Sequence, residues 1–284
     1  MSSWTSLTVT AHPALAEAIE SFLLDHGAPG LQTEELGDAI RITAHFAADA
    51  PLDELAGYLD GLLALQPALP RPALETGSVT DSGWAENWKA HFPPLAIGER
   101  LFVHPPWIAE VPAGRVSIVL DPGMAFGTGH HASTRGCLTL LEAALRERPR
   151  ARVFDLGTGS GILAIAARKL GAAEAWAIDI DADALAVAAE NAAVNGVTDG
   201  LHFGTALDAV PGDFDVVLAN LFAAQLIEFA AVIAGRLRPG GMAIGAGILT
   251  VEAAAVRDAW SAAGLVASGE WSDEGWTALA YRRP

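Results

Sequence analysis

Three glycines at alternate positions, Gly157, Gly159 and Gly161, follow an apolar stretch that ends in Asp155-Leu156. Glycine allows sharp turns and lets a ligand approach the backbone closely. The residues after Gly161 are apolar and helix-forming, so the segment is typical of a strand, a ligand-binding turn and a helix. We therefore expect Gly157 and Gly159 to line a ligand site.

The spacing of these glycines differs from that of a dinucleotide-binding turn. That fingerprint is G-x-G-x-x-G, whereas here Gly161 comes one place early and Ile162 stands at the expected third position. Asp155 also lies at the predicted strand tip, where a carboxylate would repel the negative charges of a pyrophosphate. A ligand with a cationic end suits this site better.

A second carboxylate, Asp179, ends the next predicted strand and stands 22 residues after Gly157. At the tip of the second strand, a carboxylate can accept hydrogen bonds from both ribose hydroxyls. Asp181 and Asp183 follow closely, and aspartate near a helix start satisfies free N–H groups. We assign ribose binding to Asp179 and helix capping to the other two.

Asp155, the glycines and Asp179 together specify an adenosine-type ligand whose tail is partly cationic and carries no phosphate. S-adenosylmethionine has this chemistry, because it joins a nucleoside to a sulfonium and to an amino-acid end with its own ammonium. The spacing resembles that of the Rossmann-like methyltransferases, so S-adenosylmethionine is the expected cofactor. An NAD-dependent oxidoreductase and a catalytically idle cofactor-binding module are the alternatives from other functional classes.

Two further stretches narrow the resemblance. Residues 121–134 read D-P-G-M-A-F-G-T-G-H-H-A-S-T, which is similar to the signature D-P-G-x-A-F-G-T-G-x-H-x-T-T of the ribosomal protein L11 methyltransferase (PrmA-type) family. Residues 215–220, D-V-V-L-A-N, resemble that family's D-x-x-x-A-N segment. Because the acidic front part and its linker also look similar, the resemblance covers nearly the whole chain. Ser133 and the pair Leu221-Phe222 depart from the family pattern.

The resemblance implies roles for individual residues. Thr134 matches a cofactor-binding threonine, and residues 126–128 lie in a loop expected to fold over the cofactor. Asn220 matches the asparagine at the catalytic face, where its neutral amide can accept an N–H bond and aim the lone pair of an amine. The expected cofactor-binding set is Phe126, Gly127, Thr128, Thr134, Asp155, Gly157, Gly159, Asp179 and Asn220.

From about residue 95 the sequence alternates between strand-like and helix-like stretches. Such alternation implies a parallel sheet with helices on both faces, and a closing hairpin implies that a late strand runs antiparallel. With the resemblance, the expected fold is α/β: a Rossmann-like domain with a mostly parallel seven-stranded sheet whose last strand is antiparallel. Strands are expected at residues 101–104, 115–120, 152–155, 175–179, 201–204, 215–219, 242–246, 265–271 and 276–281, and helices at 131–147, 162–170, 183–195, 223–236 and 251–263.

Residues 1–83 are expected to form a small α+β unit in the order β-α-β-β-α-β, which is the ferredoxin-like pattern. Its strands are expected at residues 4–10, 31–36, 39–46 and 74–80, with helices at 12–26 and 51–63. We interpret this unit as a substrate-recognition domain and residues 95–284 as the methyltransferase domain.

The stretch between them, residues 84–94, is the expected linker because Pro93-Pro94 blocks regular structure. Trp84, Trp88 and Phe92 recur in it at four-residue spacing. These aromatic side chains either dock the linker on a domain or form a hinge that contacts the substrate.

The chain is strongly acidic, with 17 Lys and Arg against 34 Asp and Glu and a net charge of −17. Such a surface repels phosphate, so direct binding to nucleic acid is not expected. Twelve acidic and two basic side chains leave −10 on residues 1–83 alone. This imbalance favours recruitment of a basic protein.

The remaining features are weaker. The single Cys137 cannot form an internal disulfide and is expected to be buried in a helix. The adjacent His130-His131 pair is not expected to bind a metal. The run Arg146, Arg148, Arg150 and Arg152 is either a solvated helix end or a phosphate contact. Because no signal peptide and no membrane-spanning apolar run is recognised, a cytoplasmic location is expected.

These observations predict an S-adenosylmethionine-dependent protein N-methyltransferase. The resemblance implies that it modifies lysine ε-amines, with the N-terminal α-amine as a further candidate, on the basic ribosomal protein L11. A lysine methyltransferase with another protein target is the related alternative. No residue stands out as a general base, so the route by which the acceptor amine loses its proton is left open.

Overall fold

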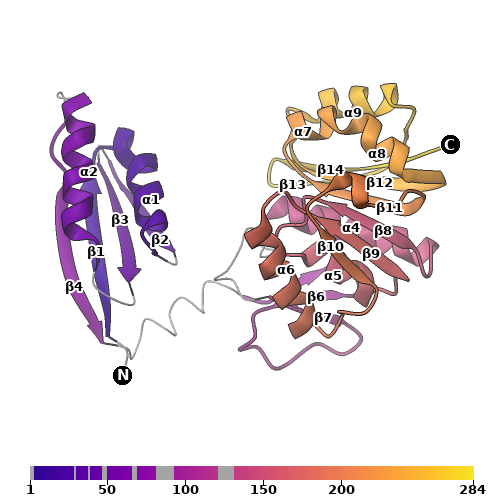
Figure 1. Cartoon of the computed structure of the whole chain (residues 1–284), viewed down its shortest axis with the longest axis horizontal. Helices are drawn as coiled ribbons and strands as arrows, with labels where there is room; N and C mark the ends of the chain where they lie inside the picture. Colours follow the sequence, from indigo (N-terminus) through magenta and orange to yellow (C-terminus); the bar gives the residue numbers. More distant parts are fainter. Residues whose placement is uncertain are drawn as a thin grey trace. The chain divides into compact units, whose positions relative to one another are not determined.

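A computed structural model describes residues 3–28, 30–37, 39–46, 50–65, 69–80, 93–120 and 131–284. The chain divides into two compact units, Met1–His91 and Phe92–Pro284 (Figure 1). Trp84, Trp88 and Phe92 of the expected linker lie outside the described residues, so their interpretation stays a prediction.

The first unit is a four-stranded sheet with two helices. Strand order is β2-β3-β1-β4, and every neighbouring pair is antiparallel. This order confirms the ferredoxin-like prediction. The elements are β1 (Ser3–Ala11), the short 3-10 helix η1 (Pro13–Leu15), α1 (Ala16–Asp25), β2 (Leu31–Leu36), β3 (Ala39–Phe46), α2 (Leu52–Leu65) and β4 (Ala73–Thr80).

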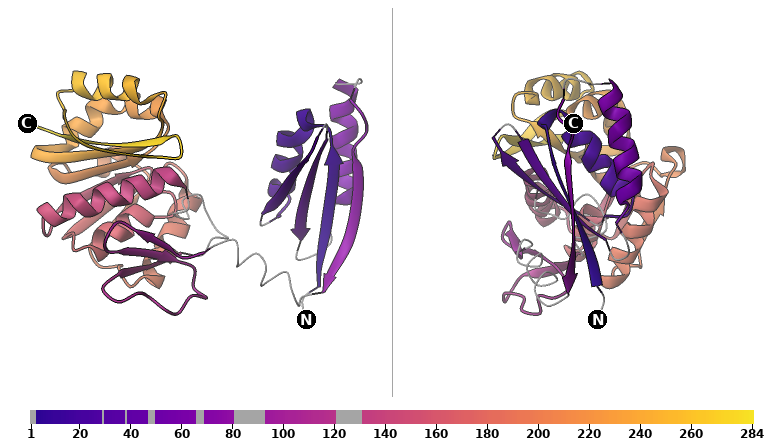
Figure 2. Two further views of the ribbon diagram at one scale, coloured as in Figure 1. Left: turned by 180° about the vertical axis from the view of Figure 1, so that it is seen from behind. Right: turned by 90° about the vertical axis from the view of Figure 1, so that its left-hand side faces the viewer.

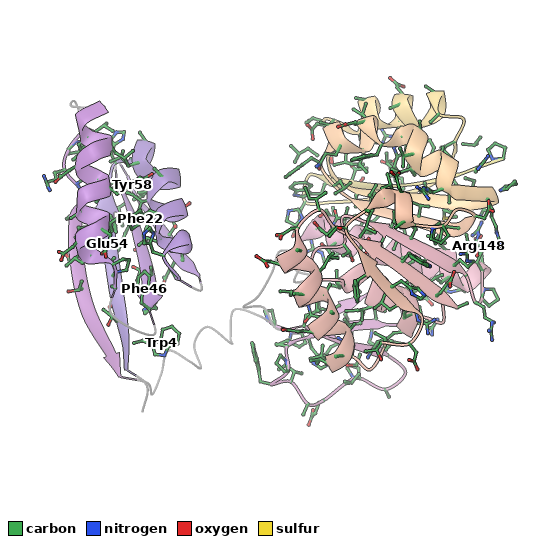
Figure 3. All side chains as sticks on the ribbon, viewed as in Figure 1. Trp4, Phe22, Phe46, Glu54, Tyr58 and Arg148 are labelled. Atoms are coloured by element: carbon green, nitrogen blue, oxygen red, sulfur yellow. The ribbon has the colours of Figure 1, made fainter. Side chains whose placement is uncertain are left out.

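Alternating burial explains this sheet. In β3, Ile40 and Ile42 point to the helices and are buried, whereas Arg41 between them is exposed. Both helices lie on the same face of the sheet (Figure 2). On that side Phe22 of α1 stacks on Tyr58 of α2, with ring centroids 4.9 Å apart (Figure 3). On the opposite face, the hydroxyl groups of Thr8 in β1 and Thr43 in β3 lie 3.2 Å apart.

The second unit contains the predicted α/β domain. Its elements are β5 (Leu95–Ile97), β6 (Leu101–His104), β7 (Val116–Val119), α4 (Ala132–Glu147), β8 (Arg152–Leu156), α5 (Ile162–Lys169), β9 (Glu174–Ile178), α6 (Ala182–Val194), β10 (Leu201–Gly204), η3 (Leu207–Ala209), β11 (Phe214–Asn220), α7 (Ala223–Glu228), α8 (Ala230–Arg236), β12 (Leu237–Leu249), α9 (Ala253–Ala262), β13 (Val266–Asp273) and β14 (Trp276–Arg282).

Seven strands form the main sheet in the order β10-β9-β8-β11-β12-β14-β13. The pairs from β10 to β12 are parallel, and β14 runs antiparallel to both β12 and β13. This confirms the prediction of a mostly parallel sheet whose last strand is antiparallel. Strand order reverses between β8 and β11, and ligands of open α/β sheets bind at such a switch point, outside the carboxyl ends of the strands.

Helices cover both faces of this sheet (Figure 1). Residues of α4 and α5 share one apolar core with β6 and β7, while α7, α8 and α9 build the core of the other face around the fully buried Trp260. The three-stranded sheet β5-β6-β7 belongs to the α4–α5 side.

Two sequence-based boundaries were wrong. The helix expected at residues 223–236 is two helices, because Phe229 leaves the helical region with ψ near 3°. The strand expected at residues 242–246 begins earlier, because Pro239-Gly240-Gly241 belongs to β12. There the N–H of Gly240 donates to the Arg283 carbonyl at 2.8 Å, and the Arg283 N–H donates to the Gly241 carbonyl at 2.9 Å. This pairing with the distant C-terminal segment extends the strand.

Candidate active site

The glycine loop connects β8 to α5 at the switch point. Gly157, Gly159 and Gly161 all have positive φ angles, of 75°, 51° and 81°, which favour glycine. The N–H groups of Gly157 and Thr158 both donate to the Ile178 carbonyl at 2.9 Å. The loop is therefore fixed to the end of β9, the neighbouring strand.

A side chain would also be close to its neighbours at two of these positions. A Cβ on Gly157 would lie 2.5 Å from Leu221 Cδ2, just after β11. A Cβ on Gly161 would lie 3.0 Å from the Cβ of Ala188 in α6. Although Gly161 comes one place early for a dinucleotide fingerprint, it still serves close packing between the loop and a helix.

Asp155 lies beneath this loop and is fully buried. Its Oδ2 accepts a hydrogen bond from Thr158 Oγ1 at 2.6 Å, and its Oδ1 has no hydrogen-bond partner among the described residues. Burial raises the pKa of Asp155 to about 7, against the lowering effect of hydrogen bonds from Thr158 and the Ala164 backbone. Buried polar atoms normally have a hydrogen-bond partner, so this oxygen is an acceptor for a donor that lies outside the described residues, and a ligand with a cationic end suits it.

Asp179 follows β9 and is partly exposed. Its Oδ2 accepts the Gly159 N–H at 2.9 Å, and its Oδ1 accepts the Asp181 N–H at 3.1 Å. An ionised carboxylate has about four acceptor sites, so both oxygens can accept further hydrogen bonds. Asp181 is the N-cap of α6, where it accepts the Asp183 N–H at 2.9 Å, as predicted.

Asn220 ends β11 and meets Thr134 of α4. The Asn220 Nδ2 donates to Thr134 Oγ1 at 3.2 Å. Thr134 is buried, whereas Asn220 is partly exposed, and Oδ1 of Asn220 has no hydrogen-bond partner within the described part of the chain. The fold therefore brings together two predicted residues that are 86 positions apart, and within the described part of the chain the amide oxygen can accept a further hydrogen bond.

Gly247 is a site residue that the sequence did not single out. Its φ is 84°, and a Cβ there would lie 2.4 Å from the Leu221 carbonyl oxygen and 3.2 Å from Asn220 Oδ1. The absence of a side chain at Gly247 thus leaves room for the Asn220-Leu221 backbone. The signal that could have revealed it was a glycine directly after the predicted strand 242–246, because glycine in or beside a strand often marks close approach of another backbone.

Exposed apolar side chains surround these polar groups. Ile180, Phe222 and Val251 follow the carboxyl ends of β9, β11 and β12, and their exposed fractions are 96%, 74% and 88%. They are the three most exposed of the large hydrophobic side chains described. Apolar surface gathered beside polar groups at one edge of a sheet is typical of a binding site.

Other predicted residues lie elsewhere. Phe126, Gly127, Thr128 and His130 fall in residues 121–130, outside the described residues. His131 is the N-cap of α4, where its Nδ1 lies 2.7 Å from Ser133 Oγ. In the described part of the chain, no three His, Cys, Asp or Glu side chains group in a way that could hold a metal ion, and no helix is long and apolar enough to cross a membrane.

The arginines near the end of α4 contact other residues of the chain, and Cys137 lies in the core. Arg146 pairs with Glu142 and Glu99, and Arg148 donates to the Gly240 carbonyl at 3.1 Å. These contacts favour a helix end held by local pairs over a phosphate contact. Cys137 is fully buried, as predicted, and burial raises the pKa of its thiol, which makes it unreactive.

Comparisons with known proteins identify the family of the chain. The model of the family "Ribosomal protein L11 methyltransferase (PrmA)" matches residues 3–284. The ribosomal protein L11 methyltransferase of Trichlorobacter lovleyi is 38% identical, covering 99% of this chain and 98% of that protein. The one from Geobacter sulfurreducens is 42% identical, covering 93% and 87%.

A solved structure is similar as well. The ribosomal protein L11 methylase from Lactobacillus delbrueckii subsp. bulgaricus is 32% identical, with a TM-score of 0.62, covering 67% of this chain and 98% of that one. S-adenosylmethionine is the cofactor of this group of enzymes. The chain therefore belongs to the ribosomal protein L11 methyltransferase (PrmA) family of S-adenosylmethionine-dependent methyltransferases.

Proposed function

We propose that this protein methylates lysine ε-amines of ribosomal protein L11, and that the N-terminal α-amine of that protein is a second acceptor. The relatives' names supply the target protein. The observation that carries the chemistry is the Asn220 amide at the carboxyl end of β11, which Thr134 holds and whose Oδ1 has no partner among the described residues. Because the chain belongs to a methyltransferase family, the alternative of an NAD-dependent oxidoreductase is excluded.

The residues at this edge suit the cofactor. When bound, S-adenosylmethionine supplies a methyl group carried on a positively charged sulfur. Asp179 has acceptor sites left for ribose hydroxyls, and the unpartnered Oδ1 of Asp155 suits a cationic donor. Gly157 and Gly159 have no side chains to obstruct a ligand. Phe126, Gly127, Thr128 and Thr134 complete the proposed cofactor-binding set.

The acceptor must arrive as a neutral amine. A free lysine has a pKa of about 10.4, so it is almost entirely protonated at neutral pH. A carboxylate beside the amine would raise that pKa further. Asn220 avoids this effect, because its uncharged Oδ1 accepts an N–H and orients the lone pair. Orientation of this kind supplies a large part of the rate of a methyl transfer.

The first unit is proposed to recruit the substrate. The two arginines of residues 1–83 are both paired, Arg41 with Glu34 at 2.9 Å and Arg71 with Asp60 at 2.7 Å. The remaining carboxylates give residues 1–83 a net charge of −10, which complements a basic ribosomal protein. In this proposal residues 84–94 connect the recognition domain to the methyltransferase domain, nucleic acid is not bound directly, and the enzyme works in the cytoplasm.

Intact-mass analysis tests the proposal. The protein is incubated with S-adenosylmethionine and purified, unmethylated L11, and in parallel with a mixture of free ribosomal proteins. We expect steps of one methyl mass on L11 alone, and peptide mapping that places them on lysines and the N-terminus. Methylation of another protein but not L11 supports the alternative target, and no transfer to any protein supports the idle module.

A further inference from the structure

The first turn of α4 holds the Asn220 amide through Thr134, whose Oγ1 accepts a hydrogen bond from Asn220 Nδ2 at 3.2 Å. An amide group is planar, so its nitrogen and its oxygen turn together. The position of this helix turn therefore affects the direction in which Asn220 Oδ1 points.

The turn between β13 and β14 reaches the same edge of the sheet. Trp276, the first residue of β14, lies opposite Leu249, the last residue of β12. The Gly275 carbonyl accepts the Thr250 N–H at 2.9 Å. Glu274 and Gly275 both have positive φ angles, of 50° and 80°, as the two central residues of a tight hairpin turn do. The turn thus has a defined place beside the end of β12.

Arg135, the residue after Thr134, joins the hairpin turn to α4. Its Nη2 donates to Asp273 Oδ2 at 3.1 Å and to Glu274 Oε2 at 2.7 Å. The Arg135 side chain is 23% exposed, whereas the two carboxylate side chains are more than half exposed. Ion pairs of this kind add little to stability, but these two fix the helix turn relative to the hairpin.

Aromatic contacts bring the hairpin against α4 on both sides of Arg135. The His131 ring meets the Trp276 ring edge-on, with centroids 4.3 Å apart and an interplanar angle of 73°. On the other side, a Cβ on Gly136 would collide with the Trp271 ring, so the helix and β13 approach closely there. A displacement of the hairpin turn therefore moves the first turn of α4.

We propose that Arg135 is a positioning residue for the Asn220 amide. Its ion pairs with the hairpin turn hold the first turn of α4 where Thr134 Oγ1 meets Asn220 Nδ2, and so keep Oδ1 directed at the acceptor amine. This inference deepens the proposed function and rests on it in one respect, because Asn220 must orient the amine.

Arg257 provides a matched control on the same hairpin. It lies in α9, and its Nη2 is 2.8 Å from Glu270 Oε1 of β13. Helix α9 belongs to the core of the opposite sheet face and contains none of the predicted site residues. Arg135→Met and Arg257→Met each remove an arginine from this hairpin, but only Arg135→Met breaks the connection to α4. If Arg135 only stabilised the fold, both variants would lower the melting temperature and neither would change the rate of the folded enzyme.

The first measurement is the single-turnover rate with L11 and saturating S-adenosylmethionine, well below the melting temperatures. We expect Arg135→Met to be about tenfold slower than the wild type, and Arg257→Met to keep the wild-type rate. In a Thr134→Val background, where the acceptor for Asn220 Nδ2 is absent, Arg135→Met should slow the reaction by less than twofold more. A wild-type rate in Arg135→Met, an equal loss in Arg257→Met, or the same loss in both Thr134 backgrounds overturns the inference.

The second measurement needs no protein acceptor. The side-chain amide signal of Asn220 is identified in the ¹⁵N–¹H spectrum by its absence from Asn220→Asp. We expect Arg135→Met to shift this signal toward its position in Thr134→Val, and Arg257→Met to leave it unchanged. Asp273→Ala/Glu274→Ala removes the same ion pairs from the other side, and it should give the same shift if Arg135→Met does not fold.

An Asn220 signal that stays at its wild-type position in the folded variants overturns the inference. A wild-type enzyme that transfers no methyl group to L11, while the amide signal shifts as expected in the variants, contradicts only the proposed function.

Discussion

The seven-stranded sheet has an amino edge, where its parallel strands begin, and a carboxyl edge, where they end. These two edges differ in how their polar groups are satisfied. At the amino ends of the strands, arginine side chains satisfy carbonyls and carboxylates of the same chain. Arg148, labelled in Figure 3, is one of them. The arginines and their partners are Arg148 with the Gly240 carbonyl, Arg236 with the Leu207 carbonyl, Arg238 with Asp215, Arg282 with Glu147, and Arg283 with the Ala234 carbonyl.

The carboxyl edge is left incomplete by comparison. Asp155 and Asn220 each keep an oxygen without a hydrogen-bond partner among the described residues. Ile180, Phe222 and Val251 expose apolar surface there. Because the same strands run from one edge to the other, the difference in polar partners and exposed apolar surface arises from the loops. An edge that a ligand completes retains acceptors and apolar surface, whereas an edge without a ligand is closed by internal bonds.

The largest loss of activity is expected from adding one methyl group to Gly247 at the carboxyl edge. Gly247→Ala places a Cβ 2.4 Å from the Leu221 carbonyl oxygen, at a φ of 84°. Because backbone must move, we expect a loss of about 2–4 kcal/mol in the free energy of unfolding. Displacement of Asn220 should lower kcat about 100-fold, measured with saturating S-adenosylmethionine and L11.

Gly240→Ala is the matched control on the same strand. Gly240 has a similar φ of 79°, but it lies at the amino edge and a Cβ there meets nothing within 4 Å. We expect a cost of about 1–2 kcal/mol from the left-handed backbone alone, and an unchanged kcat. An equal loss of kcat in both variants would remove the distinction between the edges.

The second-largest effect is expected from removing the Asp179 carboxylate, which should weaken cofactor binding. Asp179→Ala loses the acceptor proposed for the ribose and leaves the Gly159 N–H without its partner. Hydrogen bonds to a charged group contribute about 1.5–3 kcal/mol, so we expect S-adenosylhomocysteine to bind about 10–100-fold more weakly by calorimetry. Asp181→Ala removes only a helix cap, so we expect this variant to bind S-adenosylhomocysteine as tightly as the wild type does.

The pH dependence of cofactor binding tests the buried carboxylate. The pKa of Asp155 is raised to about 7, so the group gains a proton as the pH falls through 7 and can no longer attract a cation. We expect affinity for S-adenosylhomocysteine to fall by up to about tenfold per pH unit below 7. Asp155→Asn should bind weakly at every pH and lose this slope; a slope that persists in the variant assigns it to another group.

The raised pKa of Asp155 also affects the free energy of unfolding. Cofactor affinity should rise with pH, whereas this free energy should fall. The native pKa of Asp155 lies above the unfolded value of about 3.9, so the folded protein holds this proton more tightly. Its contribution to the free energy of unfolding is fully present below that value and is lost as the pH rises through 7. Without cofactor, the wild type should therefore lose more stability than Asp155→Asn between pH 5 and 8, as measured by urea unfolding.

The smallest effect on activity is expected at the amino edge. Arg236→Met removes donors from the carbonyls of Leu207 and Pro211. Each carbonyl left without a partner is costly, so we expect a loss of about 1–3 kcal/mol in the free energy of unfolding by urea denaturation. Because the site lies at the other edge, KM values should stay unchanged; a raised KM for S-adenosylmethionine would show that the two edges are coupled.

The sequence was sufficient where the signal is local. Alternation of strand and helix patterns predicted the fold, because each element carries its own periodicity. Asp155, Gly157 and Asp179 could be proposed as site residues because polar and glycine residues follow strand ends there at fixed spacing. Asp181 was recognised as a helix cap for the same reason.

Contacts between distant segments could not be predicted. The role of Gly247 depends on backbone 26 residues away, at Leu221. The burial of Asp155 beneath Thr158, and hence its raised pKa, likewise depends on how the loop closes. Such properties arise from tertiary packing, which single-sequence patterns do not contain.

The most direct test of the carboxyl edge as a methyl-transfer site is the single-turnover rate of Asn220→Ala. The rate is measured with L11 and saturating S-adenosylmethionine, alongside the dissociation constant of S-adenosylhomocysteine. We predict a rate about 100-fold below that of the wild type, with the dissociation constant changed less than threefold. A wild-type rate in Asn220→Ala would contradict the assignment of Asn220 as the group that orients the amine.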